Sequence, residues 1–507
     1  MTPHISAAIE CFRDRLPGRI TTPGTDTIVS ASNDFTTLTN QPWSSTCWQT
    51  AAAYILLQNT TEVSTAVSII KQTGIKLVVR STGHNPNPGF SSIGSDGIVL
   101  DLGKLRSGDL IDDKNGNGKV ARVGAGIRWG TVYDWLEELG LSAIGGRDPS
   151  VGMGLLVGGG LGAVPNLHRL ATDGVCGFEA VLSDGRIIIA NAQENANLYR
   201  ALKGGGNNKP LRPDHSLIPL QYSISLYNPT DYVNINRATV ELQEVMEAGP
   251  KIGSFTNYQP FVAVGLITAG YSDSASEGEH EAFKPFDVLE SKMMEACPPT
   301  KGTLGSLAKI MAHAAGDAKK KYVSTLTTTP SQDLYSDTYH AWCKALGMLP
   351  KDAVLHYTIQ SVGSSCVRRG ESNGGNSRLL TLVSLGWVFT VEWPRESSPD
   401  DDEAARNAVR YLVKKVEEAA ESRDQLLPYL CATFASSDQS VLRSYGSGNV
   451  EVMRAVVQKY DPHGVFKISS RGPYISMNFY SMSFSGLAIS NGMEGCLVIS
   501  ESTMGVL

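Results

Sequence analysis

The sequence predicts an α+β protein of two domains, and three observations support this. The chain has 507 residues, more than a single hydrophobic core usually accommodates. Residues 54–102 alternate between strand-like apolar runs and one helical segment, the pattern of a small α/β unit. Further apolar runs of strand type, at 260–267, 353–360 and 383–393, indicate a sheet in a second domain.

The composition excludes several classes of protein. Hydrophobic residues make up 41% of the chain and charged residues 19%, as in ordinary globular proteins. The net charge of −6 gives no basic field for nucleic acid, and we interpret Lys319–Lys321 as a solvated helix face. No apolar stretch reaches membrane-spanning length. The eight cysteines contain no Cys-x-x-Cys pair, so we expect no metal site.

The N-terminal segment predicts a helix over residues 5–16, followed by a polar connection to about residue 45. Glu10, Arg13 and Asp14 stand where a secretory signal peptide would need its apolar region. We therefore expect a cytoplasmic protein.

The first α/β unit begins with a strand at 54–57. Helical spacing of apolar residues predicts a helix over 62–74, and Gly74 is a typical helix end. Strands are predicted at 75–79 and 97–102. The loop between these two strands should therefore leave the edge of a sheet.

That loop, residues 80–93, is where we expect the chemistry. Small residues at 81–83 let backbone N–H groups approach an anionic ligand, and Arg80 could add positive charge, so the loop suits a pyrophosphate. The alternative is a surface turn in which His84 is merely solvated. Considered alone, the loop favours that alternative.

A glycine-rich segment follows a predicted strand at 119–126 and a predicted helix at 129–139. Residues 145–162 contain eight glycines, which are unfavourable in a helix or an ordinary strand. We expect a ligand to lie against this segment. The alternative is a packing turn beneath a sheet.

A β-hairpin is predicted at 173–190, because Ser183–Gly185 supplies a turn between two apolar strands. A short helix at 197–203 should follow and end at Gly204–Gly206.

In this order, the segments resemble the FAD-linked oxidoreductases of the berberine-bridge-enzyme-like branch of the vanillyl-alcohol-oxidase and p-cresol-methylhydroxylase (PCMH) family. The motifs are Arg-Ser-Thr-Gly-His-Asn from residue 80, the glycine-rich segment, Asp-Gly-Val at 173–175 and Leu-Tyr-Arg-Ala-Leu-Lys-Gly-Gly-Gly-Asn from residue 198. Tyr-Asp-Pro-His-Gly-Val-Phe at 460–466 is similar to the family's terminal segment. Each motif alone is weak, and their common order makes the resemblance specific.

The resemblance implies a PCMH-type FAD-binding domain of two α/β subdomains in residues 1–225, with its core at about 45–225. Residues 226–430 would form a substrate-binding domain whose antiparallel sheet covers the flavin. Residues 431–475 would return to the FAD domain. Residues 476–507 have no counterpart in the pattern and form an unassigned tail.

The resemblance also implies that His84 forms the covalent bond to the 8α-methyl group of the flavin, as in many members. Such a bond raises the reduction potential of the flavin and favours acceptance of a hydride. Bicovalent members carry a cysteine where this chain has Asp148, so we expect one link. The implied cofactor-binding residues are Arg80, Ser81, Thr82, Gly83, His84, Asn85, Gly89, Gly146, Ser150, Val151, Gly152, Gly154, Gly159, Gly160, Asp173 and Val175.

Three segments depart from the family pattern. Leu155 stands where a glycine is common, residues 209–215 replace a strand that normally touches the cofactor, and residues 429–434 replace a common Asn-Tyr pair.

The implied activity is FAD-dependent removal of a hydride from a small secondary metabolite, with O2 as electron acceptor. Candidates for the base are Tyr445, Tyr357 and Glu392, where a tyrosine would need a lowered pKa and a glutamate partial burial. Each position considered singly is more often core or surface. Two alternatives stay open: an FAD-containing cyclase of natural-product biosynthesis, and a flavin-binding protein without activity.

Overall fold

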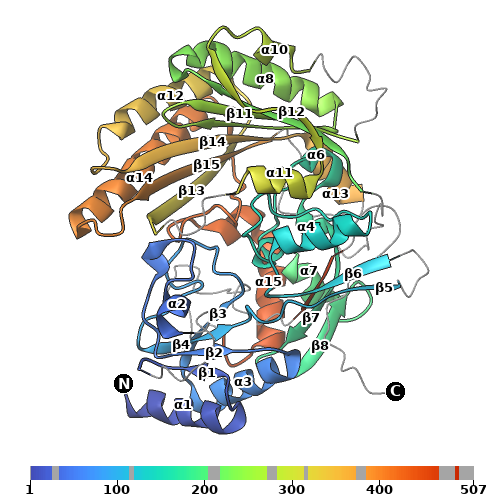
Figure 1. Ribbon diagram of the computed structural model, residues 1–507, viewed down its shortest axis with the longest axis vertical. Coiled ribbons are helices and arrows are strands. Elements are labelled where there is room, and N and C mark those ends of the chain that lie inside the picture. The colour runs from blue at the N-terminus through green and yellow to red at the C-terminus, as the bar shows by residue number, and fades with distance from the viewer. Residues whose placement is uncertain are drawn as a thin grey trace.

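The computed structural model describes residues 2–24, 34–112, 119–203, 217–270, 282–312, 318–372, 384–466 and 486–489. Two bodies, each with its own hydrophobic core, are stacked along the long axis of the molecule (Figure 1). The first body contains two small sheets, and the second contains one large sheet with helices on one face. The predicted α+β class is confirmed.

The first sheet of the first body carries the loop that contains His84. Its strands, in spatial order, are β1 (Ile20–Thr21), β2 (Ala53–Leu56), β4 (Gly97–Asp101) and β3 (Lys76–Arg80). Both β2 and β3 run parallel to β4. Helix α3 (Thr60–Thr73) connects β2 to β3, begins at the side-chain cap of Asn59 and ends at Gly74, whose φ is 62°. Helix α1 (Pro3–Arg15) packs on α3, and α2 (Phe35–Thr39) precedes β2.

The second sheet contains a strand from the C-terminal tail. Its order is β5 (Gly108–Asp112), β6 (Lys119–Gly124), β17 (Gly486–Ile489), β7 (Val175–Val181) and β8 (Ile187–Asn191). The strand β17 lies antiparallel between β6 and β7. Four residues of the tail that matched no family pattern therefore complete this sheet. The helices of this part are α4 (Trp129–Glu138), α5 (Gly154–Val157), α6 (Pro165–His168) and α7 (Ala196–Leu202).

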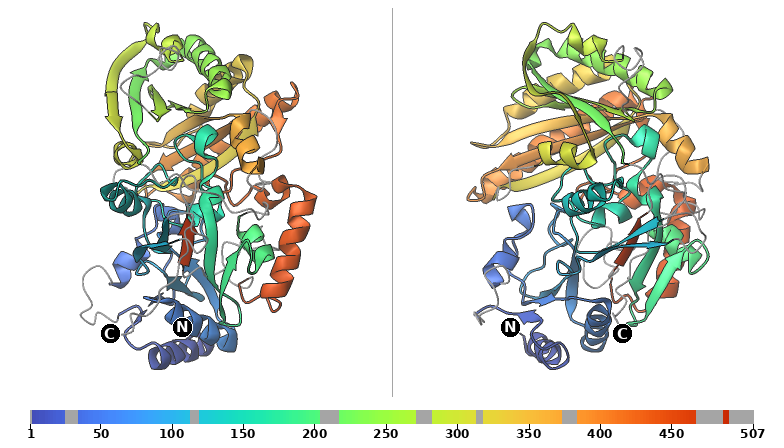
Figure 2. Two further views of the ribbon diagram at one scale, coloured as in Figure 1. Left: turned by 90° about the vertical axis from the view of Figure 1, so that its right-hand side faces the viewer. Right: turned by 45° about the vertical axis from the view of Figure 1, so that its right-hand side comes forward.

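The Tyr-Asp-Pro segment returns to the first body. Helix α15 (Ser447–Tyr460) packs against α7, and Figure 2 shows it alongside the first body in both views. The Asp461 carboxylate accepts hydrogen bonds from the backbone N–H groups of Val465 (2.8 Å) and Phe466 (3.1 Å). The Tyr460 hydroxyl donates to Asn197 Oδ1 at 2.9 Å. These bonds fix the segment beside α7, far from it in sequence.

The second body is built on an eight-stranded antiparallel sheet. The strand order is β12 (Lys292–Gly302), β9 (Leu220–Tyr227), β11 (Val262–Ala269), β10 (Ile252–Tyr258), β14 (Val354–Val362), β15 (Ser384–Trp393), β13 (Lys320–Thr328) and β16 (Leu426–Leu427). Its helices are α8 (Tyr232–Ala248), α10 (Lys284–Asp287), α11 (Leu304–Ile310), α12 (Gln332–Leu346), α13 (Ser364–Ser372) and α14 (Pro399–Glu421). The helices α8, α12 and α14 cover one face of the sheet, and the other face is turned to the first body (Figure 1).

The interpretation of Lys319–Lys321 as a solvated helix face is wrong. Lys320 begins strand β13, and Lys321 is 2% exposed. Burial of this ammonium is tolerated because Lys321 lies opposite Glu392 on β15, with Nζ 2.8 Å from Oε1.

Within the described ranges, no helix combines the length and apolar character required to cross a membrane.

Candidate cofactor site

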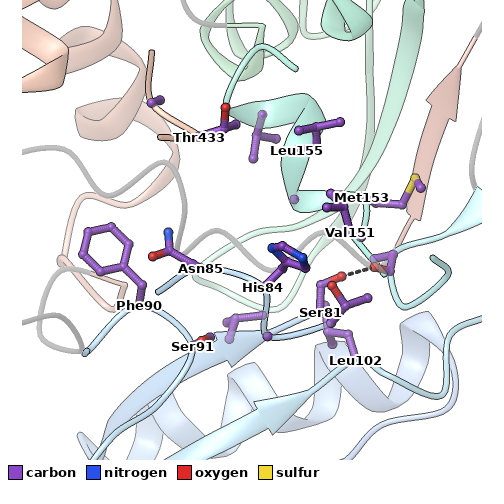
Figure 3. Close-up of a pocket in the computed structure, with 18 of the residues that line it drawn as sticks. Ser81, His84, Asn85, Phe90, Ser91, Leu102, Val151, Met153, Leu155 and Thr433 are labelled. Atoms are coloured by element: carbon purple, nitrogen blue, oxygen red, sulfur yellow. Dashed lines mark hydrogen bonds between the residues drawn. The ribbon is translucent and has the colours of Figure 1, made fainter. Parts of the chain in front are cut away.

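A cavity of about 250 Å³ lies where the His84 loop faces the glycine-rich segment. A third wall comes from residues 432–434, in the segment that precedes α15. Figure 3 shows His84 between the loop that carries Ser81 and the segment that carries Val151 and Leu155. The lining residues are Val79, Ser81, Thr82, Gly83, His84, Asn85, Phe90, Ser91, Leu102, Ala125, Val151, Gly152, Met153, Gly154, Leu155, Val157, Ala432, Thr433 and Phe434.

Arg80 anchors the strand end from which the His84 loop leaves. Its guanidinium is 1% exposed, pairs with the Asp101 carboxylate at 2.7 Å and donates to the Leu38 carbonyl at 2.8 Å. Arg80 therefore holds β3 to β4 and lies outside the cavity lining. The chain then turns at Ser81, which donates to the Ala125 carbonyl (2.5 Å), and at Gly83, whose φ is 76°.

We expect Asp101→Asn to destabilise the first body by about 3–5 kcal/mol, because it leaves the Arg80 guanidinium buried without a counterion. The matched control is Asp96→Asn in the turn before β4, whose pair with Lys76 has side chains 47% and 39% exposed. The control should change the free energy of unfolding by less than about 1 kcal/mol. Denaturant unfolding of both variants checks this, and equal effects would contradict it.

His84 is held on two sides. Its Nε2 lies 3.1 Å from the Ser150 hydroxyl, and its ring stacks on Trp43 with centroids 4.8 Å apart and planes 12° from parallel. The Nζ of Lys321 lies 4.8 Å from the centroid of the Trp43 ring. The stack thereby connects the His84 loop to the sheet of the second body.

The glycine-rich segment serves both packing and the cavity. A Cβ added to Gly152 would lie 2.4 Å from Thr82 Oγ1, and one added to Gly158 would lie 2.5 Å from Thr433 Cγ2. These glycines allow the three walls to approach one another. Gly154 differs, because an added Cβ would meet no protein atom within 4 Å and Gly154 lines the cavity. A side chain at Gly154 would therefore project into the space that a ligand would use.

Half of the residues expected to bind the cofactor lie in the cavity lining, and half lie outside it. The lining includes Ser81, Thr82, Gly83, His84, Asn85, Val151, Gly152 and Gly154. Outside it lie Arg80, Gly89, Gly146, Ser150, Gly159, Gly160, Asp173 and Val175. The lining residues that were not expected to bind the cofactor are Val79, Phe90, Ser91, Leu102, Ala125, Met153, Leu155, Val157 and residues 432–434. The departure from the family pattern at 429–434 was the one signal that pointed to the last group.

Asp173 and Val175 are engaged in the protein interior. The Asp173 carboxylate accepts from the Leu170 backbone N–H at 3.2 Å. The Val175 carbonyl accepts from the Tyr199 hydroxyl at 2.5 Å and lies 3.5 Å from Lys203 Nζ. Burial lowers the pKa of Lys203 from 10.5 to about 8, and the charge of Asp173 partly opposes this shift.

This shift predicts a pH-dependent stability. Between pH 8 and 10.5 the unfolded chain keeps a proton on Lys203 that the folded chain lacks, so the contribution of Lys203 to stability rises with pH across this window. Below pH 8 both states are protonated and the burial penalty is complete. We expect Lys203→Met to raise the melting temperature most at pH 7 and least at pH 10.5. The exposed Lys104→Met is the control, and a gain independent of pH would contradict the prediction.

The three candidate bases all lie outside the cavity lining. Tyr357 is fully buried on the helix-facing side of the sheet, where it stacks on Tyr258 with centroids 4.7 Å apart. Burial holds its pKa well above the ordinary value, the opposite of what a base requires. Its selection as a base is therefore corrected, because strand alternation turns it away from the cavity. Tyr445 is buried against Tyr429, with centroids 6.1 Å apart.

Glu392 lies on the sheet face turned to the first body, but two lysines bind its carboxylate. Lys321 Nζ lies at 2.8 Å and Lys319 Nζ at 3.8 Å. A carboxylate oxygen engaged in this way is not presented to a substrate. We therefore assign Glu392 a structural role, as the counterion of Lys321, whose ammonium lies over the Trp43 ring.

Arg147 links the glycine-rich segment to the same face of the sheet. Its Nη2 donates to Gln360 Oε1 on β14 at 2.8 Å. Enclosure by protein lowers the pKa of Arg147 to about 10, so the guanidinium stays charged at neutral pH. The groups that oppose the shift are the Cys431 thiol and the Tyr133 hydroxyl, and none of the described carboxylates does so. Arg147 is thus a cation beside Cys431, the residue next to the 432–434 wall.

The lining fits a flat, partly polar ring system. Val79, Leu102 and Val157 supply apolar walls, and small residues on the His84 loop allow close approach of the backbone. The Ser91 hydroxyl is buried and has no hydrogen-bond partner among the described residues, so it can serve a polar atom of a ligand. Together with the imidazole of His84 and the open face of Gly154, these features suit the isoalloxazine ring of a flavin.

Comparison with known proteins agrees with this geometry. An FAD binding domain family matches residues 51–191. An FAD-dependent monooxygenase of Arthrobotrys oligospora is 32% identical, with 85% of this chain and 84% of the relative covered. The FAD-dependent monooxygenase prx3 of Penicillium roqueforti is 37% identical, with 89% and 91% covered.

Solved structures show the same fold at low sequence identity. The 6-hydroxy-D-nicotine oxidase of Arthrobacter nicotinovorans aligns with a TM-score of 0.70 and 17% identity, covering 89% of this chain and 97% of that one. The glucooligosaccharide oxidase of Acremonium strictum, whose FAD is 6-S-cysteinyl and 8α-N1-histidyl, aligns with a TM-score of 0.66 and 18% identity, covering 86% and 94%.

Fold, cavity and relatives define a flavoprotein enzyme with FAD as its cofactor. The chain belongs to the FAD-linked oxidoreductases represented by these FAD-dependent monooxygenases, and its fold is that of the berberine-bridge-like and vanillyl-alcohol-oxidase-type flavoproteins. The expected family, fold class and cofactor are confirmed.

Proposed function

We propose that this oxidoreductase removes a hydride from a C–H bond of a small secondary metabolite and passes the electrons to O2. The observation that carries the proposal is the common cavity of the His84 loop, the glycine-rich segment and residues 432–434, below a polar face of the large sheet. The bound FAD supplies the hydride acceptor. The relatives are named monooxygenases and the structural neighbours oxidases, and both words denote enzymes that use O2.

His84 is the residue that would attach the flavin, through a single bond. The glucooligosaccharide oxidase carries a cysteinyl and a histidyl link. This chain has Asp148 at the position we align with the cysteine, and that carboxylate is engaged by Ser150, whose hydroxyl lies 2.5 Å from Asp148 Oδ1. The apolar walls of the cavity would shield a bound ring from water.

Arg147 and Gln360 are the groups we assign to the substrate. The Arg147 guanidinium is charged and partly buried, and its described hydrogen bond goes to a neutral amide. It therefore favours an anionic oxygen as a further partner. We infer that the substrate carries a carboxylate, a phenolate or an enolate.

Tyr445 stays a candidate base, since it packs on Tyr429 at the start of the 429–434 segment, and Tyr445→Phe with unchanged turnover would remove it.

The experiment that tests the function starts from a deletion strain. The small molecule that accumulates in its extracts is added to the purified holoenzyme without oxygen. We expect the flavin to bleach, and admission of O2 to restore the colour with formation of hydrogen peroxide. Conversion of the metabolite without bleaching would instead support a cyclase, and absence of conversion would support a non-catalytic flavin-binding protein.

A further inference from the structure

We propose that Asp148 and Ser150 form a relay that places the proton of His84 on Nε2 and thereby selects Nδ1 as the atom that bonds the flavin. The proposal rests on the covalent attachment proposed above and goes beyond it, because it assigns two positioning residues. Attachment through N1 (Nδ1) of the imidazole is the linkage of the 8α-N1-histidyl flavin in the glucooligosaccharide oxidase.

The directions of the hydrogen bonds around Ser150 determine which nitrogen of His84 carries the proton. The Asp148 carboxylate only accepts hydrogen bonds when ionised, and its Oδ1 receives both the Ser150 backbone N–H (2.7 Å) and the Ser150 hydroxyl (2.5 Å). Because the hydroxyl proton points to Asp148, the Ser150 oxygen acts as the acceptor toward its other neighbour. That neighbour is His84 Nε2 at 3.1 Å, which therefore carries the proton.

The tautomer follows from this contact. A neutral imidazole has one N–H and one nitrogen lone pair, so a proton on Nε2 places the lone pair on Nδ1. The stack on Trp43 restricts the ring to its own plane, and the contact with Ser150 sets its rotation within that plane. Both neighbours thus act on the orientation of the same nucleophilic atom.

The covalent step explains why a carboxylate is useful at this place. As Nδ1 forms its bond to the 8α carbon, one C–H bond of the methyl group breaks and its proton leaves to solvent. Two electrons pass into the flavin ring, and O2 takes them up to give hydrogen peroxide. The imidazole becomes cationic until Nε2 loses its proton through Ser150. Asp148, which is 9% exposed, stabilises that charge and accepts the proton by way of the Ser150 hydroxyl.

Asp148 stands at the position where bicovalent members carry a second flavin anchor. Bicovalent relatives use a cysteine there to bond the flavin, as the resemblance implied. In this chain the same position supports the histidine link. The position that carries an anchor in bicovalent members would here carry a positioning residue.

The test compares acid-stable flavin in holoenzymes purified from one host. Ser150→Ala should lower the covalent fraction by at least about tenfold while FAD stays bound without a covalent link, because the relay acts as a general base for the attachment. Ser150→Thr keeps the hydroxyl and should restore attachment. The control is Ser92→Ala, a buried serine of the His84 loop outside the relay, which should keep the wild-type fraction.

Further measurements separate this relay from a merely structural effect. Tandem mass spectrometry and NMR of the flavinyl peptide should place the bond on Nδ1 of His84. Asp148→Asn, which keeps the size of the side chain and removes its charge, should slow attachment even when the protein folds normally. A bond to Nε2, or full attachment in both Ser150→Ala and Asp148→Asn, would overturn the relay and leave the covalent link intact. Acid-released flavin in the wild type would overturn the link itself.

Discussion

Replacing His84 by alanine is expected to abolish acid-stable flavin while FAD remains bound in the cavity. The imidazole is the proposed attachment point, whereas the rest of the lining, including Thr82, Gly154 and the apolar walls, stays in place. The covalent bond raises the reduction potential, so its loss should slow acceptance of a hydride. Each lowering of the potential by about 30 mV changes the two-electron equilibrium about tenfold.

Three measurements check this expectation. Acid precipitation should move the yellow colour from the pellet to the supernatant, potentiometry should give a lower potential, and anaerobic reduction by the accumulated metabolite should be slower. The matched control is His463→Ala, an exposed histidine of the terminal segment. Acid-stable flavin in the His84 variant would contradict the prediction.

Local patterns in the sequence predicted much of the first body, because its elements carry their own start and stop signals. Helix α3 ends at Gly74 as predicted, since glycine adopts the left-handed φ of 62° without a steric penalty. The run at 75–79 became β3, and the loop that follows it lines the cavity. The predicted strands at 353–360 and 383–393 correspond to β14 and β15.

The orientation of residues on the large sheet could not be predicted in the same way. Strand alternation separates two faces, but here one face is covered by helices and the other by the first body, so neither face shows a polar pattern that marks it as exposed. Tyr357 and Glu392 were therefore both admissible as bases, although they lie on opposite faces.

Interactions between residues distant in sequence account for the other differences. Arg80 was expected to bind phosphate, and its buried ion pair with Asp101 could not be predicted from the sequence. Lys321 was expected to be solvated, but it is buried beside Glu392 and Trp43. The strand β17 has no local signal that assigns it to β6 and β7. The three glycines at 204–206, and residues 209–215, which depart from the family pattern, lie outside the described residues.

Arg147→Met is expected to remove binding of a simple anionic probe while FAD stays bound. Arg147 belongs to the glycine-rich segment and donates to Gln360, and the described carboxylates do not neutralise it. A benzoate ion that enters this region would form a charge-assisted hydrogen bond with the guanidinium, and bidentate contact adds geometric specificity. Titration of the holoenzyme with benzoate should therefore change the flavin absorbance spectrum with a measurable dissociation constant.

The neutral isostere benzamide separates the charge from the shape of the ring. We expect wild type to bind benzoate more tightly than benzamide, with a preference of about tenfold or more for one charged hydrogen bond of 1.5–3 kcal/mol. Arg147→Met should abolish this preference, and Arg147→Lys should retain part of it because an ammonium keeps the charge without the planar fork. Equal affinity for both probes in wild type would show that Arg147 does not select an anion. Loss of affinity for both probes in Arg147→Met would indicate a packing role for its side chain beside Cys431 and Tyr133.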